Sequence, residues 1–286
     1  MTITITTSNV NGIRAAKRKG IEQWAAKNTP DVWCMQEVRA PQNEIDPIFD
    51  EFGFEYATAG RIADQSGLDR MNELCRIKGR AGVGLLSALP VIDKRYGLPG
   101  LAEDVDSGRW IEADVKTPQG YTVTVVCVYV HAGNTDDPEK MKQKYRFLDT
   151  MLVRMGQLRD EAAHGGRQAV LCGDFNIAHT PLDIKNAKAN EKHAGFLPEE
   201  RAYVDKWLGE LEFVDVMRSL CGDIQGPYTW WSQRGRAFDN NVGWRIDYQF
   251  ATPELAETAR GFVIDKAPTY DLRWSDHAPL SITYDV

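Results

Sequence analysis

Residues 169–176 read Ala-Val-Leu-Cys-Gly-Asp-Phe-Asn, and this stretch decides the fold of the chain. Its apolar first half predicts a buried strand, and the turn that follows presents the carboxylate of Asp174 and the carboxamide of Asn176. Three other strand-like runs, at residues 2–7, 31–35 and 261–264, are also followed by polar residues. Those residues are Ser8, Asn9 and Asn11 after the first run, Gln36 and Glu37 after the second, and Ser275, Asp276 and His277 after the third. We therefore expect a sheet-based fold whose strand ends assemble one polar site.

Strand-like and helix-like segments alternate along the chain, which excludes the all-α and plain all-β classes. A β-branched run at 121–130 follows a Pro-Gln-Gly turn and predicts a hairpin with 109–115. A helix is expected to start at Asp137-Pro138, because proline is favoured in a first turn. Its apolar residues recur at steps of three and four and predict one buried stripe. The stripe is Met141, Tyr145, Leu148, Leu152, Met155 and Leu158. Other expected elements are helices at 17–26 and 198–208 and strands at 244–251 and 279–284.

The composition favours one domain over residues 1–286. No Pro/Gly/Ser-rich linker interrupts the chain, and 43% hydrophobic residues suffice for a sizeable core. The cysteines, odd in number and without CxxC spacing, predict reduced thiols rather than disulfides or a zinc site, and hence a reducing cytoplasm. They are Cys34, Cys75, Cys127, Cys172 and Cys221. The N-terminus lacks the pattern of a signal peptide, and no apolar run approaches the ~20 residues that span a bilayer.

The net charge of −7 argues against attraction of nucleic acid to the whole surface, because that attraction comes from basic residues displacing counterions at phosphates. Three basic clusters nevertheless lie just beyond the candidate strand ends. They are Arg14, Lys17, Arg18 and Lys19; Lys185, Lys188 and Lys192; and Arg234, Arg236 and Arg245. Any single cluster is more often an ordinary solvated surface. All three beside one site favour a local contact with an anionic ligand.

The polar residues at the strand ends are rich in oxygen ligands. They comprise Glu37, Asp174, Asp247 and Asp276, with Asn9, Asn11 and Asn176 beside them. This set suits Mg²⁺ or Mn²⁺, which bind one or two carboxylates and keep waters to share with a substrate phosphate. His277 adds a group that can donate to a phosphate oxygen, while Asp174 can deprotonate an attacking water. Each signal alone is more often a cap, a turn or a structural pair. Together they predict metal-assisted phosphodiester hydrolysis.

Short blocks in a fixed order carry a family resemblance. They are Asn9-Val10-Asn11-Gly12-Ile13-Arg14, Gln36-Glu37, Gly82-Val83-Gly84-Leu85-Leu86-Ser87, Tyr129-Val130, Gly173-Asp174-Phe175-Asn176, Asn240-Asn241-Val242-Gly243-Trp244-Arg245-Ile246-Asp247-Tyr248 and Ser275-Asp276-His277. From residue 3 to residue 284 the chain resembles exonuclease III and the related apurinic/apyrimidinic (AP) endonucleases. The block at 243–248 separates the DNA-repair members from the wider endonuclease/exonuclease/phosphatase superfamily.

The resemblance implies a four-layer α/β sandwich, with two mixed β-sheets packed face to face and flanked by helices. It also implies a divalent-metal enzyme that cuts double-stranded DNA on the 5′ side of an abasic site, with 3′-5′ exonuclease and 3′-phosphodiesterase activity at 3′ ends. By this resemblance Glu37 is similar to the main metal-binding carboxylate, with Asn11 and Asp276 near the metal. Asp174 is similar to the group that aligns or activates the nucleophile.

Other polar residues are similar to phosphate contacts of the family. His277 would contact the scissile phosphate and be held by Asp247, for which the alternative is a satisfied buried carboxylate. Such pairing of a histidine with an orienting carboxylate recurs in catalytic sites. Asn9 and Asn176 would position phosphate or water. Tyr129 would hydrogen-bond the phosphate or its leaving oxygen.

An enzyme that recognises a missing base needs an apolar slot too small for an intact flipped nucleotide. Trp230 and Trp244, with Ile246 as a third wall, fall where the family lines its abasic-sugar pocket. The alternative is that these tryptophans pack between the sheets. Asn186 and Asn190 resemble DNA-contacting asparagines of the family, and Ala194-Gly195-Phe196, which follow them, also match the family pattern.

Several positions depart from the family pattern or carry a different expectation. Asn11 stands where several members carry Asp, and His193 stands where Asn is common. His131 replaces a usual Pro and is expected to share a strand face with Tyr129, either as a second imidazole at the phosphate site or as a turn residue. The stretch 61–80 is longer than its equivalent and is either a DNA-contacting arm or an exposed insertion. Trp231 is expected to pack in the core.

Three alternatives stay open: a superfamily phosphatase for phosphoinositides or nucleotides, a non-specific DNase I-like nuclease, and an idle nucleic-acid-binding module. An idle module would have lost the metal carboxylate or the histidine, whereas Glu37, Asp174 and His277 are all present. The Gly-Trp-Arg-Ile-Asp-Tyr block opposes the phosphatase. No partner protein is implied, and a monomer is expected.

Overall fold

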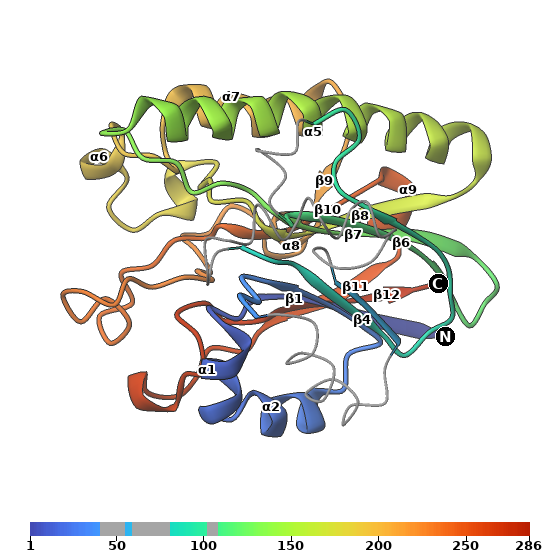
Figure 1. Cartoon of the computed structure of the whole chain (residues 1–286), viewed down its shortest axis with the longest axis horizontal. Coiled ribbons are helices and arrows are strands. Elements are labelled where there is room, and N and C mark those ends of the chain that lie inside the picture. Colours follow the sequence, from blue (N-terminus) through green and yellow to red (C-terminus); the bar gives the residue numbers. More distant parts are fainter. Residues whose placement is uncertain (41–54, 59–80, 102–107) are drawn as a thin grey trace.

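A computed structural model describes residues 1–40, 55–58, 81–101 and 108–286. The stretch 61–80, expected to be an arm or an insertion, lies outside the described residues. Two β-sheets pack face to face in the centre of the molecule (Figure 1). The first sheet consists of β1 (Thr2–Asn9), β2 (Val32–Gln36), β3 (Glu55–Thr58), β4 (Gly84–Ser87), β11 (Ala259–Ile264) and β12 (Leu280–Asp285). The second consists of β5 (Val91–Tyr96), β6 (Trp110–Lys116), β7 (Thr122–Tyr129), β8 (Gln168–Asp174), β9 (Val214–Asp215) and β10 (Asp247–Ala251).

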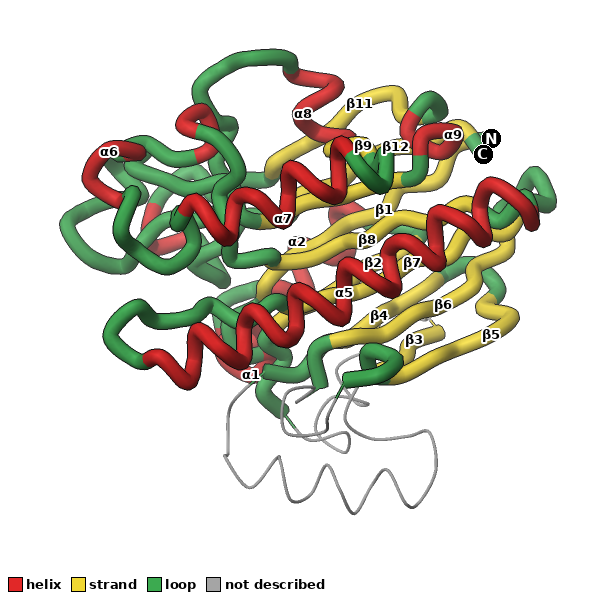
Figure 2. Tube along the Cα trace, turned by 90° about the horizontal axis from the view of Figure 1, so that it is seen from above, coloured by secondary structure: helices red, strands yellow, loops and turns green. Residues whose placement is uncertain are grey.

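Both sheets are mixed. The strand orders are β11-β12-β1-β2-β4-β3 and β5-β6-β7-β8-β10-β9. β1 pairs with β2, and β7 with β8, in parallel, while the flanking pairs are antiparallel. The expected hairpin is confirmed as the antiparallel pair β6 and β7. Thr2 pairs with Asp285, so the two ends of the chain lie side by side, at the end of the molecule opposite α6 (Ala187–Asn190) (Figures 1 and 2).

Helices cover the outer face of each sheet, which completes the expected four-layer α/β sandwich (Figure 1). α5 (Pro138–Gly165) and α7 (Pro198–Gly209) lie over the second sheet, and α5 runs in roughly the same direction as its strands (Figure 2). α1 (Ile13–Arg18) and α2 (Ile21–Asn28) lie over the first sheet. The shorter helices are α8 (Val216–Cys221), α9 (Pro253–Ala256) and single 3₁₀ turns at Pro181–Asp183 and Tyr270–Leu272.

The core between the sheets follows the two-residue alternation of strands. On β7, Val125 and Cys127 face the other sheet, while Val126 and Val128 face the helices. Cys172 of β8 likewise lies between the sheets. The polar residues at the ends of these strands continue the same alternation. Their side chains therefore point into the space between the two sheets.

The structure differs from the sequence expectations at three elements. The helix expected at 17–26 is divided at Gly20, whose φ of 98° is left-handed and leaves the helical geometry. Trp244 precedes the strand that was expected to contain it, because β10 begins at Asp247. On α5 the buried face includes Lys144 and Arg154, which a search for apolar residues alone passes over.

Other expectations agree with the structure. Among the described cysteines, Cys34, Cys127 and Cys172 are buried free thiols, and Cys221 is also free. The helix expected at 198–208 is α7, and Asp137 caps α5 by accepting a hydrogen bond from the Lys140 amide. No helix in the described part of the chain combines the length and apolar character that crossing a membrane requires.

Candidate active site

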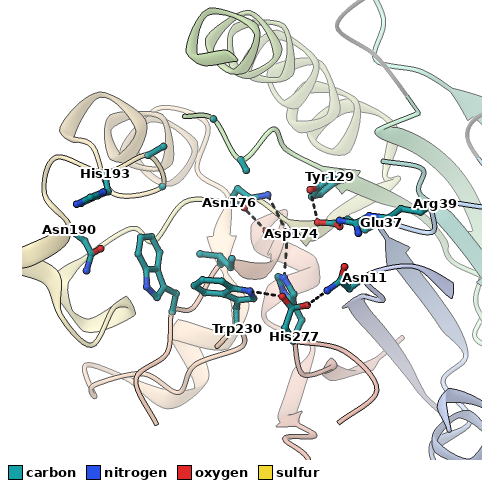
Figure 3. Close-up of a pocket in the computed structure, with 17 residues that line it drawn as sticks. Asn11, Glu37, Arg39, Tyr129, Asp174, Asn176, Asn190, His193, Trp230 and His277 are labelled. Atoms are coloured by element: carbon teal, nitrogen blue, oxygen red, sulfur yellow. Dashed lines mark hydrogen bonds and ion pairs between the residues drawn. The ribbon is translucent and has the colours of Figure 1, made fainter. Parts of the chain in front are cut away.

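A cavity of about 510 Å³ opens where the strand ends of both sheets meet (Figure 3). It gathers predicted residues from five strand ends and from the loops that follow them. Its lining consists of Asn11, Glu37, Arg39, Tyr129, Ala132, Gly133, Asp174, Asn176, Asn190, His193, Ala194, Gly195, Trp230, Trp244, Ile246, Asp276 and His277.

Strand register brings three of the predicted residues side by side in the second sheet. Tyr129 of β7 pairs with Asp174 of β8, which pairs in turn with Asp247 of β10. Tyr129 and Asp174 stand two residues after Cys127 and Cys172, so alternation points their side chains between the sheets. The sequence therefore determines both the row and the direction of these groups.

His277 joins this row from the loop before β12. Its Nδ1 lies 2.8 Å from Asp247 Oδ2, and its Nε2 lies 3.8 Å from Asp174 Oδ2. All three side chains are buried, and each presents one possible ligand atom within 4.8 Å of the others. Because the Nδ1 contact fixes the ring, Nε2 is the nitrogen left facing Asp174.

Burial and charge oppose each other in this group. Burial would lower the pKa of His277, but the carboxylates of Asp247, Asp174 and Asp276 outweigh it and raise that pKa. Burial raises the pKa of Asp174 well above the ordinary range of a carboxyl, and Asp247 adds to the rise, while His277 and an amide of Asn9 oppose it. Asp174 is thus a stronger base than an exposed aspartate, and His277 favours its charged form.

Asn9, at the end of β1, links the two sheets. Its amide nitrogen donates to Glu37 Oε1 and to Asp174 Oδ2, at 2.9 Å in each case. Its side-chain oxygen accepts a hydrogen bond from the backbone N–H of Asn11 at 2.9 Å. Asn9 is 1% exposed and does not line the cavity, so its amide hydrogens serve the two carboxylates.

Glu37 follows β2 in a left-handed conformation, with φ of 54°. The Tyr129 hydroxyl donates to its Oε1 at 2.6 Å, and Arg39 pairs with its Oε2 (Figure 3). Burial, with the charge of Asp174, raises the pKa of Tyr129 to about 12, so the phenol keeps its proton near neutral pH. In this arrangement the Tyr129 hydroxyl is a donor next to two carboxylates.

Asp276 directly precedes His277 and also lines the cavity. Its Oδ1 accepts from Asn11 Nδ2 at 2.8 Å, and its Oδ2 accepts from Trp230 Nε1 at 3.2 Å (Figure 3). Burial raises the pKa of Asp276, but the charge of His277 and these donors outweigh it and lower the pKa. Asp276 is therefore held ionised at the cavity wall.

Asn176 completes the polar floor. Its backbone N–H donates to Asp174 Oδ1 at 2.9 Å, and its Nδ2 donates to the Val130 carbonyl at 3.0 Å and to Asp174 Oδ2 at 3.2 Å. Its φ of 50° is left-handed, a conformation that asparagine tolerates better than most residues. The turn after β8 thus places the carboxamide against the carboxylate that precedes it.

An apolar wall stands beside the polar residues. The rings of Trp230 and Trp244 meet edge to face, with centroids 6.0 Å apart, and Ile246 lies buried next to them. The Trp230 ring also lies 6.4 Å from that of His277. Trp231 turns the other way and packs on Phe238 in the core, as expected.

The structure separates the remaining predicted residues. Asn190 and His193 line the cavity, whereas Asn186 is exposed at the start of α6 and does not. His131 lies past the end of β7 and packs edge-on against Phe147 of α5, so the expected strand face shared with Tyr129 is wrong. The alternation does not extend beyond the last residue of the strand.

Five lining residues were given no role on the sequence alone: Arg39, Ala132, Gly133, Ala194 and Gly195. Arg39 follows Glu37 by two residues and Ala132 follows Tyr129 by three, so both lie just past strand ends. The match of Ala-Gly-Phe at 194–196 to the family pattern was the one available signal for Gly195. Small residues carry no chemistry of their own, which is why a search for reactive groups misses them.

The donor set fits a hard divalent cation. The carboxylates of Glu37, Asp174 and Asp276 and the amides of Asn11 and Asn176 all face one cavity, and oxygen ligands are those that such cations prefer. Asp174, Asp247 and His277 form a second cluster with metal-ligand spacing. In that cluster, the 2.8 Å contact between His277 Nδ1 and Asp247 Oδ2 is enough to explain why the ligand atoms lie so close together.

Comparison with known proteins agrees with this geometry. The chain is 29% identical to an exodeoxyribonuclease of Bacillus subtilis over 97% of its length and 98% of that protein. An AP endonuclease structure from Archaeoglobus fulgidus superposes with a TM-score of 0.81 at 30% identity, covering 99% of this chain and all of that one. A 3′ phosphatase from Neisseria, bound to product DNA hairpin, superposes with the same TM-score at 27% identity over 99% of this chain and all of that one. The endonuclease/exonuclease/phosphatase family pattern matches residues 6–277, and the chain belongs to this family.

Proposed function

We propose that this protein is a metal-dependent DNA-repair nuclease that hydrolyses the phosphodiester 5′ to an abasic site. The same site would also remove nucleotides and blocking groups from 3′ ends. One observation carries the proposal: a buried Asp174–His277–Asp247 row joined through Asn9 to Glu37, beside an apolar wall in one cavity. The names of the exodeoxyribonuclease, AP endonuclease and 3′ phosphatase relatives support it.

The chain's own residues divide the chemistry. Asp174, with its raised pKa and its position next to the cavity, takes the proton of the attacking water. His277, charged and held by Asp247, donates from Nε2 to a non-bridging oxygen of the scissile phosphate. Asn176 fixes Asp174 and presents its carboxamide to the phosphate or the water.

Glu37, Asn11 and Asp276 would hold Mg²⁺ or Mn²⁺. Such an ion neutralises charge on the phosphate and on the leaving oxygen. Tyr129, which keeps its proton, donates to the phosphate or to the leaving oxygen once its contact with Glu37 is exchanged. Asn9 does not reach the cavity itself. It keeps the carboxylates of Glu37 and Asp174 at a fixed separation, and so positions the water and the phosphate indirectly.

The substrate is double-stranded DNA with an abasic site or a 3′ end. Trp230, Trp244 and Ile246 form a wall against which a sugar without its base can pack, while an intact nucleotide is too large. Asn190 lies at the cavity rim, and Asn186 lies outside it on the exposed start of α6, where flanking DNA backbone would pass. We infer that the protein works as a monomer over residues 1–286 in a reducing compartment, as the buried free thiols suggest.

The test is cleavage of a duplex oligonucleotide with one abasic analogue. Blunt duplex and an inositol phosphate serve as competing substrates, each with Mg²⁺ and with a chelator. We expect cleavage 5′ to the analogue that requires the metal. Preference for the inositol phosphate would contradict the proposal, and equal cleavage of all DNA would indicate a non-specific nuclease.

Two variants locate the activity. Asp174→Asn is expected to reduce cleavage by at least about a hundredfold, because it removes the base. Trp244→Ala is expected to reduce the preference for abasic over intact ends more than the rate itself. Asp205→Asn, the same change at a carboxylate 69% exposed on α7, is the matched control and should retain full activity. Circular dichroism checks the fold of each.

A further inference from the structure

A buried ion pair lies behind the cavity, where α5 packs on α7. Lys144 of α5 and Glu200 of α7 are both 0% exposed, and Lys144 Nζ lies 2.5 Å from Glu200 Oε1. Burial lowers the pKa of Lys144, and the charge of Glu200 opposes this. Taking two charges out of water costs several kcal/mol per ion, and apolar residues of similar volume often stabilise a core as well or better. Stability alone is therefore a weak reason for this pair.

Lys144 contacts two loops that line the cavity. Its ammonium donates to the Ala132 carbonyl at 3.2 Å and to the Asn176 carbonyl at 3.0 Å. Ala132 follows β7, which ends with Tyr129, and Asn176 follows β8, which ends with Asp174. One buried cation thus ties together the backbones of the two loops that carry catalytic side chains.

Glu200 holds a third loop. Its Oε2 accepts the backbone N–H of Gly195 at 2.6 Å and that of Leu197 at 3.0 Å. The Gly195 carbonyl in turn accepts the Ala178 N–H at 2.8 Å, which closes the connection to the segment after β8. Because Oε1 faces Lys144 and Oε2 faces the loop, the carboxylate transmits the position of α5 to residues 195–197.

Gly195 is the point where this loop meets the apolar wall. Its φ of +92° favours glycine. A Cβ added there would lie 3.0 Å from Trp244 Cζ3 and 3.1 Å from the Asn176 carbonyl oxygen. The loop therefore packs tightly against both the apolar wall and the turn after β8, and an added carbon would require its neighbours to move by a few tenths of an ångström.

We propose that Lys144 and Glu200 are positioning residues. Together they set the separation between the turn that carries Asp174 and Asn176 and the apolar wall that includes Trp244. Neither side chain touches substrate. The pair links substrate recognition to catalysis, because the apolar wall and the catalytic base Asp174 are held in place by the same two charged side chains. This inference rests on the proposed function for the identity of the substrate, but its geometry does not depend on it.

The test compares two double variants, each of which removes a buried ion pair whose basic member lies on α5. Lys144→Met/Glu200→Gln removes both charges, keeps the volume and leaves a side-chain carbonyl oxygen at position 200 that can still accept the loop amides. The control, Glu112→Gln/Arg154→Met, removes another buried pair, in which Arg154 Nε of α5 lies 2.7 Å from Glu112 Oε1 of β6. In the described part of the chain, none of the hydrogen bonds of these two side chains reaches a residue that lines the cavity. Urea unfolding measures what each pair contributes to stability.

We expect kcat on abasic duplex to fall about tenfold to a hundredfold in the Lys144/Glu200 variant, as small misplacements of reacting groups do, with a smaller change in KM and a narrower preference for abasic over intact ends. The control should keep kcat and preference near those of the wild type. An unchanged kcat and preference in the first variant, or an equal loss in the control, would overturn the proposal.

Amide hydrogen exchange gives a readout that needs no activity. In the wild type the amides of Gly195 and Leu197 should exchange about as slowly as those of β8. In the Lys144/Glu200 variant they should exchange faster, because the neutral oxygen of Gln accepts them more weakly than a carboxylate and is no longer held by Lys144. Fast exchange at both amides in the wild type would overturn the proposal even if the variant fails to fold. Slow exchange in a wild type that does not cut abasic DNA would instead remove the proposed function and leave the positioning role intact.

Discussion

Replacing Asp183 tests how the apolar wall of Trp230, Trp244 and Ile246 is anchored to the rest of the protein. Asp183 is 0% exposed in the 3₁₀ turn after the catalytic strand. Its Oδ1 accepts from Arg245 Nε at 2.7 Å and from Arg218 Nη2 at 2.5 Å, and its Oδ2 accepts the Thr180 N–H at 2.8 Å. Arg245 stands between Trp244 and Ile246 in the sequence. The carboxylate therefore anchors the segment that carries two wall residues.

The structure sets the size of the effect. Burial would raise the pKa of Asp183, but the charge and hydrogen bonds of Arg245, with those of Thr180 and Arg218, lower it from 3.8 to about 2. A carboxyl with a lowered folded pKa contributes stability above its unfolded pKa, and this contribution is lost as pH falls through the folded pKa. At about 1.4 kcal/mol per pKa unit, this lowering corresponds to about 2–3 kcal/mol.

Urea unfolding of the wild type and of Asp183→Asn over a pH series measures this contribution. Near neutral pH we expect the variant to lose about 3–5 kcal/mol of unfolding free energy, because a buried pair is broken. The difference should narrow by about 2 kcal/mol as pH falls from about 5 to about 2.5, since asparagine does not titrate. A difference that stays constant across that range would refute the reasoning.

Three further changes have defined outcomes. Asn9→Ala removes both amide hydrogens that link the cavity carboxylates, and we expect kcat on abasic duplex to fall at least about tenfold; a wild-type rate would contradict this. Gly173→Ala would place a Cβ 1.9 Å from the Val128 carbonyl oxygen, so its urea midpoint should drop sharply, and an unchanged midpoint would contradict the close packing of β7 and β8. His131→Ala should leave rate and pH profile unchanged because His131 lies off the cavity, and an altered profile would assign its imidazole to the site.

Much of the site could be predicted because it follows from strand alternation and order. Asp174 ends β8, a strand whose alternating hydrophobic residues can be recognised in the sequence, and Tyr129 ends the neighbouring strand β7. Once those rows face the other sheet, their last residues must meet there. The partners of His277 were less accessible to pattern reasoning, since Asp247 lies 30 residues earlier and only the family resemblance connected the two.

Charged residues in core positions are what sequence reasoning missed. The stripe predicted for α5 used apolar residues and therefore placed Tyr145 and Leu152 on its buried face, yet both are only partly buried. Lys144 and Arg154 occupy that face instead. A lysine is normally read as surface because burial without a partner is costly. Its partner, Glu200, lies on another helix, and no local pattern shows which carboxylate will meet it.

The distribution of charge also resolves the conflict between an acidic chain and an anionic substrate. With histidine counted as neutral, as it is in the net charge of −7, the buried charged side chains among the described residues are eight carboxylates and four basic groups. They are Glu37, Glu112, Asp114, Asp174, Asp183, Glu200, Asp215 and Asp247, with Lys144, Arg154, Arg245 and Arg273. These buried groups carry four of the seven net negative charges of the chain, and of the eight carboxylates only Glu37 and Asp174 line the cavity. Since a bound phosphate responds to the charges at the surface it meets, the overall charge of −7 overstates the repulsion that DNA would meet there.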